Sequence, residues 1–132
     1  MWDVRIESEA SAKITVERSR FFAVLRPAQD EAMIKEVLAE RHKEVRKACH
    51  HCWAARWTDG DGRLVELARD DGEVGKPGHK ILDLLRRREV EGLLVVSRVF
   101  GGVKLGPAGV GRAFKQAAEA VLDVAEGSAR KR

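Results

Sequence analysis

Apolar and polar residues recur along this chain with two different periods, which divide it into expected helices and strands. Apolar side chains recur at helical spacing in residues 30–43 and 110–126, so both segments are expected to form amphipathic helices. A period of two runs through residues 47–58 and indicates a strand, with residues 63–68 as the returning strand of a hairpin. The continuous apolar run at residues 93–96 indicates a buried strand.

The N-terminal segment predicts two further strands. They lie at residues 4–6 and 14–25, and the second bends around the turn-like residues 17–20. Pro27 ends this strand, and Asp30 is placed to cap the helix that follows.

Turn residues separate the later elements. Residues 59–62 are read as a hairpin loop, and an acidic turn at residues 70–73 is followed by a loop at residues 75–79 and a short helix at residues 81–88. Strand, glycine-rich loop and long helix complete the chain, so we expect one domain over residues 1–127 and a basic C-terminal tail.

This order of elements predicts an α+β fold of two layers. We expect a four- to five-stranded, mostly antiparallel sheet with helices mainly on one face. The other face would carry polar or aromatic residues, which makes it a candidate binding surface. The basic tail is expected at residues 128–132.

Composition narrows the class of protein only slightly. The formal net charge is +4 on a chain that is 35% charged, which by itself does not identify a nucleic-acid-binding protein. No apolar stretch is long enough to span a membrane, and the first residues lack the pattern of a signal peptide. We expect a cytoplasmic protein with no cofactor and no membrane partner, and the oligomeric state stays open.

The chain is organised around residues 98–113, where a glycine-rich loop joins the apolar strand to the long C-terminal helix. Glycines let backbone amides approach a ligand closely, and a helix N-terminus adds positive partial charge, which suits an anion such as phosphate. Arg98, Lys104 and Arg112 add mobile positive charge. Neither a P-loop nor a dinucleotide-binding fingerprint is present. A structural turn whose glycines only relax the backbone is the alternative.

The run of two cysteines and two histidines at residues 49–52 invites a metal or redox interpretation that its pattern does not favour. Within a strand the two sulfurs point to opposite faces, and no second ligand pair follows at familiar spacing. We expect reduced, buried thiols and no metal site. His50 and Cys52 share a strand face, as a cysteine–histidine nucleophile pair requires, but no third orienting group can be assigned.

Two other groups have both a functional and a structural interpretation. The three carboxylates of residues 70–73 could hold Mg²⁺ or serve acid–base chemistry, although a solvated acidic turn is favoured. Trp53 and Trp57 share a strand face near Arg56, where they could stack on nucleic-acid bases. Packing in the core or on the sheet is the favoured interpretation of this pair.

Four motifs cover nearly the whole chain: SRFFA at residues 19–23, ACHHCWA at 48–54, DDGE at 70–73 and RVFGGVKLGPAGVGRA at 98–113. In this order they resemble the N-terminal domain of the Impact/YigZ family. The resemblance implies a fold like domain 2 of the small-subunit ribosomal protein S-five, shared with elongation-factor domains. It also implies a link to translation, because eukaryotic relatives regulate initiation through a partner of the general-control kinase. The family brings no well-settled enzymatic activity.

The sequence departs from the family pattern around the candidate site. Val74 stands where the family has proline, residues 75–78 form a loop that is one residue shorter, Pro107-Ala108 replaces Thr-Gly, and Val99 replaces tyrosine. A catalytic role is therefore not carried over. From the length of the sequence we expect neither the second domain of bacterial relatives, proposed to bind nucleic acid, nor the extra N-terminal module of eukaryotic ones. Any binding is expected from this one domain or from a partner.

These observations predict a non-enzymatic, translation-associated binding domain. Its expected partner is RNA or the ribosome, or a translation-regulator protein. The alternatives are a small metal-assisted hydrolase or transferase that acts on a phosphorylated substrate, and a pure protein-interaction domain. The anion- or nucleic-acid-binding residues are predicted to be Arg98, Gly101, Gly102, Lys104, Gly106, Gly109 and Arg112, and the cleft-lining residues His50, Cys52, Asp71 and Glu73.

Overall fold

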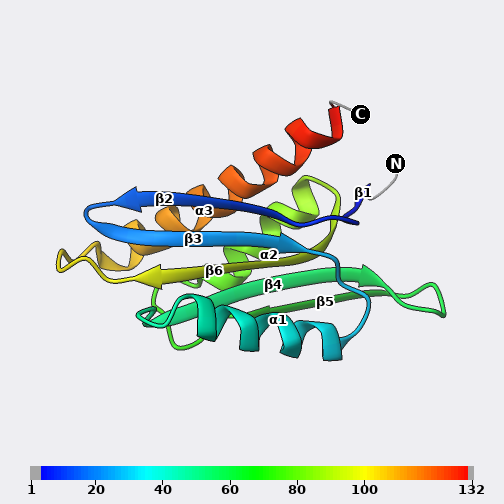
Figure 1. Ribbon diagram of the computed structural model, residues 1–132, viewed down its shortest axis with the longest axis horizontal. Coiled ribbons are helices and arrows are strands. Elements are labelled where there is room, and N and C mark those ends of the chain that lie inside the picture. Colours follow the sequence, from blue (N-terminus) through cyan, green and yellow to red (C-terminus); the bar gives the residue numbers. More distant parts are fainter. Residues whose placement is uncertain (1–3, 131–132) are drawn as a thin grey trace.

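The computed structural model describes the backbone of residues 4–130 and the side chains of residues 4–126. In chain order the elements are β1 (Val4–Arg5), β2 (Ala10–Val16), β3 (Ser19–Arg26), α1 (Glu31–Glu44), β4 (His50–Thr58), β5 (Leu64–Arg69), α2 (Pro77–Arg87), β6 (Val90–Val99) and α3 (Gly106–Arg130). The sheet has the order β2-β3-β6-β4-β5 with antiparallel neighbours, and the short β1 pairs in parallel with the start of β6 (Figure 1). The predicted α+β class with a mostly antiparallel sheet is confirmed.

The expected bend in the first long strand is a tight hairpin turn between β2 and β3. Val16 pairs with Ser19, so only Glu17 and Arg18 remain in the loop. Both have positive φ, 47° and 67°, which matches the twist of a two-residue hairpin. The second hairpin, between β4 and β5, lies where the sequence predicts it.

The main core lies between the sheet and the pair α2 and α3. Phe21 of β3 and Phe114 of α3 meet edge to face with ring centroids 5.2 Å apart, and both side chains are fully buried. β6 is buried along its whole length. A central strand that is covered on both faces reads as a continuous apolar run, which explains its pattern in the sequence.

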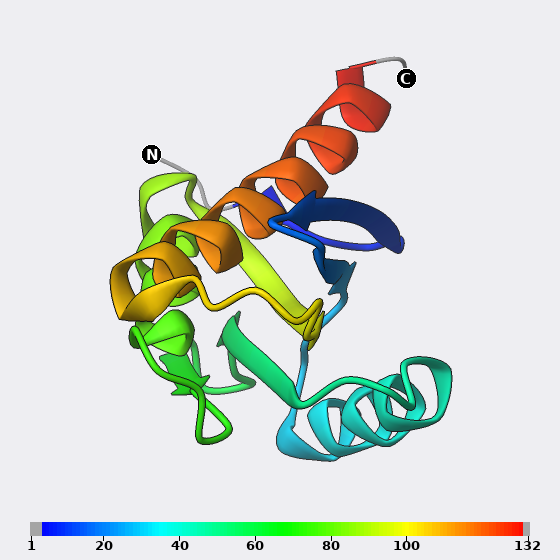
Figure 2. The ribbon, with the colours of Figure 1, turned by 90° about the vertical axis from the view of Figure 1, so that its left-hand side faces the viewer.

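α1 lies on the opposite face of the sheet from α2 and α3 (Figure 2). Its Ile34 packs in one cluster with Trp53 and Trp57 of β4 and Val95 of β6. The tryptophans are 9% and 5% exposed, so they belong to the core and are not free to stack on bases. The prediction of helices on one face thus holds for α2 and α3, whereas α1 forms a second helical layer on the other face.

α2 begins at Pro77, four residues before the helix start predicted at Ile81. Proline is favoured in the first helical turn because the missing N–H has no partner there anyway. Lys76 precedes it with a left-handed φ of 51°, and the Asp70 carboxylate accepts a hydrogen bond from the Gly78 backbone N–H at 2.8 Å. This side chain satisfies a donor of the first turn, so the acidic turn also caps α2.

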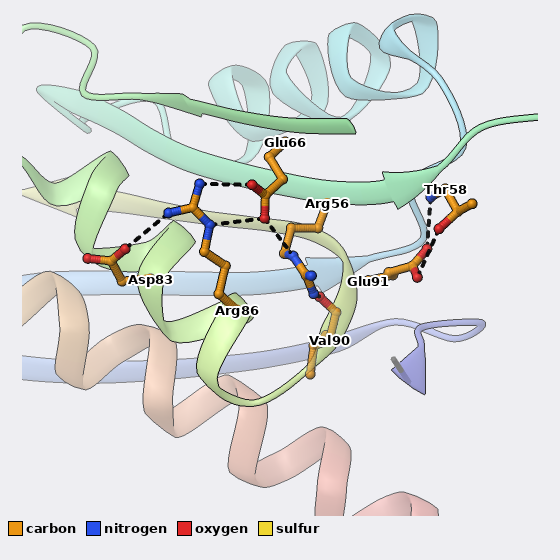
Figure 3. A network of polar contacts seen from close by, with 7 residues as sticks. All are labelled: Arg56, Thr58, Glu66, Asp83, Arg86, Val90 and Glu91. Carbon is orange, nitrogen blue, oxygen red and sulfur yellow. Dashed lines mark hydrogen bonds and ion pairs between the residues drawn. The ribbon is translucent and has the colours of Figure 1, made fainter. Parts of the chain in front are cut away.

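A polar network ties β4, β5 and α2 together at one end of the sheet (Figure 3). Arg56 is buried, and its Nε donates to the Glu66 carboxylate at 2.9 Å while its Nη1 donates to the Val90 carbonyl at 3.1 Å. Arg86 also donates to both Glu66 oxygens. The hydrogen bond from Arg86 first, and then that from Arg56, lowers the pKa of the Glu66 carboxyl. Glu91 meanwhile accepts hydrogen bonds from the backbone and hydroxyl of Thr58.

α3 extends to Arg130, three residues into the predicted basic tail, and residues 131–132 lie outside the described part. The division into a domain and a tail stays a prediction. Among the helices of residues 4–130, none combines the length and apolar character needed to cross a membrane.

Candidate functional site

The end of the sheet where β4 begins and β6 ends gathers the polar residues of the candidate site. His50 pairs with Arg98 across these strands, and the acidic turn at residues 70–73 closes over the same end. The Asp71 carboxylate accepts a hydrogen bond from the His51 backbone N–H at 2.8 Å. This set is called the polar cluster below: Cys49, His50, Asp71, Glu73 and Arg98.

Glu73 and Arg98 form a buried ion pair in the polar cluster. Arg98 Nη1 donates to Glu73 Oε2 at 3.1 Å, and the side chains are 8% and 4% exposed. The guanidinium also lies near the rings of Phe21 and Phe100, 5.8 and 5.6 Å from their centroids. Arg98 therefore neutralises a buried carboxylate. Its predicted role as a phosphate contact is not supported by this position.

The tautomer of His50 follows from its hydrogen bond. Its Nδ1 lies 2.7 Å from the Asp71 backbone carbonyl, and because a carbonyl only accepts, this nitrogen carries the hydrogen. The neutral ring thus presents an unprotonated Nε2, which lies 3.8 Å from Glu73 Oε2. Asp71 reaches this position through a left-handed φ of 51°, followed by Gly72 at 76°.

The two cysteines differ in environment, and both are free thiols. Cys52 is fully buried and its Sγ donates to the Asp70 carbonyl at 3.2 Å. Burial first, and then the nearby carboxylates, raise the pKa of this thiol well above its ordinary value, which disfavours the thiolate that a nucleophilic pair with His50 needs. Cys49 is exposed, and the prediction of two buried thiols is wrong for it. Its Sγ donates to the Arg98 carbonyl at 3.4 Å.

His51 points to the opposite face of β4, away from the polar cluster. It is 4% exposed, its Nδ1 lies 2.7 Å from the Ser97 hydroxyl, and its ring stacks on that of His42 with centroids 4.1 Å apart. Burial is the main cause that lowers the pKa of His51, and His42 adds to it.

The glycine-rich loop between β6 and α3 is held against the β2–β3 turn. Gly101 donates its backbone N–H to the Ser19 hydroxyl at 3.2 Å, and a Cβ at Gly101 would collide with the Arg18 carbonyl. Gly102 and Gly106 have positive φ, 89° and 72°. Two structural reasons for glycine, close backbone approach and positive φ angles, thus both apply in this loop.

Basic side chains surround the start of α3, which has no acidic residue in its first turn. Lys104 and Arg112 are exposed, and the Arg112 guanidinium folds back toward Gly109. Lys80 of α2 is also exposed, and its aliphatic stem packs on Gly111. None of these three cations forms an ion pair with a described residue. The first two turns of α3 with Lys80, Lys104 and Arg112 are called the α3 basic surface below.

In the structure, the predicted anion-binding residues fall into two groups. Arg98 and Gly101 are held by internal contacts, whereas Lys104, Gly106, Gly109 and Arg112 belong to the α3 basic surface. Lys80 was missed by sequence reasoning, because it belongs to α2, which is separated from the loop by the whole of β6, and only the packing of α2 on α3 brings it there.

The α+β fold, with the polar cluster and the glycine-rich loop at one end of its sheet, belongs to a known class of domain. Residues 17–122 match the Impact N-terminal domain, and the chain belongs to this family. It is 32% identical over 111 residues to the IMPACT family member YvyE of Bacillus subtilis, which covers 83% of this chain and 50% of YvyE. It is 32% identical over 121 residues to the protein IMPACT of Rattus norvegicus, covering 80% and 38%. The chain thus spans about half, or less, of these relatives.

Solved structures with the same fold include two of similar sequence. One, described as the crystal structure of an hypothetical protein, has a TM-score of 0.74 and 29% identity, and the match covers 92% of this chain and 60% of that one. The other is the two-domain translational regulator Yih1, with a TM-score of 0.60 and 26% identity over 91% of this chain and 48% of Yih1.

Proposed function

We propose that this domain is a non-enzymatic, translation-associated binding domain that contacts RNA phosphates through the α3 basic surface. The association with translation is supported by the family and by the description of Yih1 as a translational regulator. The RNA contact is carried by three cations, none of which forms an ion pair within the described part of the chain, around a helix start without acidic residues.

The proposed RNA contact rests on positive electrostatic potential from two sources, the helix N-terminus and the basic side chains around it. Helix N-termini carry partial positive charge and unpaired N–H groups that bind phosphate oxygens. Arg112 contributes a full charge within the first two turns of α3, Lys104 contributes a second from the loop just before the helix, and Lys80 adds a third from α2. Charges that have no internal partner are free to neutralise phosphates and to release counterions.

The shape of the molecule favours a polymer backbone over a small phosphorylated molecule as the ligand. A cavity of about 500 Å³ lies at the far end of α3, where Arg88, Val90 and Leu122 are among its lining residues. The α3 basic surface instead consists of exposed residues at the opposite end of that helix. Small ligands are usually enclosed, whereas phosphate backbones are contacted along open basic surfaces.

Titration of a labelled, structured ribosomal RNA fragment tests the proposal. The double variant Lys104→Ala/Arg112→Ala is expected to bind at least tenfold more weakly than the wild type at low salt, because two phosphate contacts are lost. The double variant Lys35→Ala/Lys43→Ala removes the same charge from exposed positions on α1 and is the matched control. Equal affinities for the two double variants would contradict the proposal and direct the search to a protein partner.

A further inference from the structure

We propose that Cys49, His50 and Glu73 form a zinc-binding site. This inference is independent of RNA binding, since none of these residues belongs to the α3 basic surface. The Sγ of Cys49, a ring nitrogen of His50 and a carboxylate oxygen of Glu73 all lie within 4.8 Å of one another. Thiolate, imidazole and carboxylate are the three ligand types that zinc binds in proteins.

The spacing of these donor atoms is close to that of a tetrahedral zinc centre. Zinc bonds of about 2.0–2.3 Å place neighbouring donors roughly 3.3–3.6 Å apart. His50 Nε2 and Glu73 Oε2 are 3.8 Å apart, too far for a hydrogen bond but only slightly wider than two ligands of one ion. Binding would require the side chains to draw the three donors together from separations of at most 4.8 Å.

His50 is already oriented as a metal ligand. Its Nδ1–H donates to the Asp71 carbonyl at 2.7 Å, which fixes the tautomer that leaves the Nε2 lone pair toward Glu73. Metal-ligating histidines in proteins commonly donate their other ring N–H in this way. The Asp71 carbonyl therefore acts on the ion through His50, as a positioning group.

Arg98 serves the site as a hydrogen-bonding partner of the ligand Glu73. It donates to Glu73 Oε2 at 3.1 Å, while Glu73 Oε1 accepts from the Val74 backbone N–H at 3.1 Å. These two hydrogen bonds hold the carboxylate in place, and a remaining lone pair of Oε2, the oxygen that faces His50 Nε2, would bind the ion. The positive charge of Arg98 opposes a cation, but Glu73, the Cys49 thiolate and the adjacent Asp71 carboxylate together offset the charges of arginine and zinc.

Binding of zinc releases one proton. The Cys49 thiol now donates to the Arg98 carbonyl at 3.4 Å; on binding, its S–H bond breaks, the proton passes to water and the sulfur forms the bond to zinc. Cys49 is exposed and His50 is partly exposed, so the ion can enter from solvent. Three protein ligands leave the fourth position open for water.

The mixed donor set selects the ion. Mg²⁺ and Ca²⁺ prefer all-oxygen sites, whereas sulfur and imidazole nitrogen favour zinc. Cys52, the other cysteine of the sequence motif, is not a ligand, because its buried Sγ donates to the Asp70 carbonyl. The proposed site is therefore different from a Cys-x-x-C metal site, which would use both cysteines of the motif.

The test is a titration of the full chain with Zn²⁺ alone in competition with a chromophoric chelator. We expect one zinc per chain, with affinity reduced at least tenfold in Cys49→Ser and in His50→Gln. His79→Gln replaces an exposed histidine of α2 outside the cluster and is expected to bind like the wild type. Cys49 and His50 are not fully buried, so both variants are expected to fold, which circular dichroism verifies.

Cobalt substitution gives a readout that a merely structural role would not move. The Co²⁺ form should show a sulfur-to-cobalt charge-transfer band that disappears in Cys49→Ser and persists in His79→Gln. Absence of stoichiometric zinc binding by the wild type, or undiminished binding by the folded Cys49→Ser and His50→Gln variants, would overturn the proposal. RNA affinity measured on the same variants keeps this outcome distinct from failure of the proposed function.

Discussion

The ion pair between Glu73 and Arg98 fixes the acidic turn to the end of β6, and it is the most buried charge pair of the polar cluster. Two charges that are removed from water stabilise a fold only while both are present. If one is deleted, the other remains buried and uncompensated.

Glu73→Gln is therefore expected to lower the free energy of unfolding by about 3 kcal/mol, measured by urea denaturation in the presence of a chelator. The control is Arg88→Met, which removes ion pairs with the exposed Asp123 and Glu126 and should cost less than about 1 kcal/mol. The double variant Glu73→Leu/Arg98→Met should lose less than the sum of its single variants. Equal losses in Glu73→Gln and Arg88→Met would show that the buried pair does not stabilise the turn.

His51 predicts a specific pH dependence of stability. Burial lowers its pKa in the folded state, helped by the charges of His42 and Arg41 and opposed by that of Asp71. Between the folded pKa and the unfolded value of about 6.5, the unfolded chain binds more protons. Stability is therefore fully present above the unfolded pKa and is lost as the pH falls below it.

His51→Gln, which can still bond to Ser97, is expected to flatten this dependence. The slope attributable to His51 cannot exceed about 1.4 kcal/mol per pH unit, and the measurement is a series of urea unfolding curves from pH 7.5 to about pH 5. His79→Gln should leave the wild-type slope unchanged. A slope that persists unaltered in His51→Gln would assign the dependence to other groups.

At the scale of the elements, the glycine-rich loop depends on one close backbone contact. A Cβ at Gly101 would collide with the Arg18 carbonyl, whereas a Cβ at Gly60, in the hairpin loop between β4 and β5, meets nothing within 4 Å. Gly101→Ala is expected to lower the free energy of unfolding by about 2 kcal/mol, and Gly60→Ala to change it by less than about 0.5 kcal/mol. Thermal or urea unfolding of both variants measures this difference in stability. Equal stabilities would mean that the loop can shift away from Arg18 at little energetic cost.

Most elements follow from local patterns, and the departures have local causes. Asp30 caps α1 as predicted, with its carboxylate accepting from the Met33 N–H at 2.9 Å. The start of α2 was missed because the segment from Gly75 to Gly78 reads as a loop, while Pro77 at the first helical position and the Asp70 side chain start a helix there. An amphipathic pattern also shows that α1 has a buried face, but not which face of the sheet it covers.

At the scale of the whole molecule, the sheet brings together segments that are far apart in the chain. The start of β4, the acidic turn and the end of β6 meet at one end, and the network of Arg56, Glu66 and Arg86 closes the other (Figure 3). The residue types of the candidate site were therefore available from motifs, but their partners were not. Glu73 was predicted to line a cleft and Arg98 to bind anions, and only the tertiary structure pairs them.

The two binding sites that we propose lie at one end of the domain but are built from different elements. The polar cluster is built from β4, the acidic turn and β6, whereas the α3 basic surface is built from α2 and α3. Variants in one set should leave the ligand of the other unaffected.

The salt dependence of RNA binding tests the central proposal most directly. The logarithm of the binding constant for the ribosomal RNA fragment is measured against the logarithm of salt concentration for the wild type, Lys104→Ala, Arg112→Ala and the control Lys35→Ala. If Lys104 and Arg112 each neutralise one phosphate, each of their variants should reduce the slope by about 0.7–0.9, and Lys35→Ala should retain the wild-type slope. Wild-type slopes in all three variants, or no RNA binding at low salt, would contradict the account.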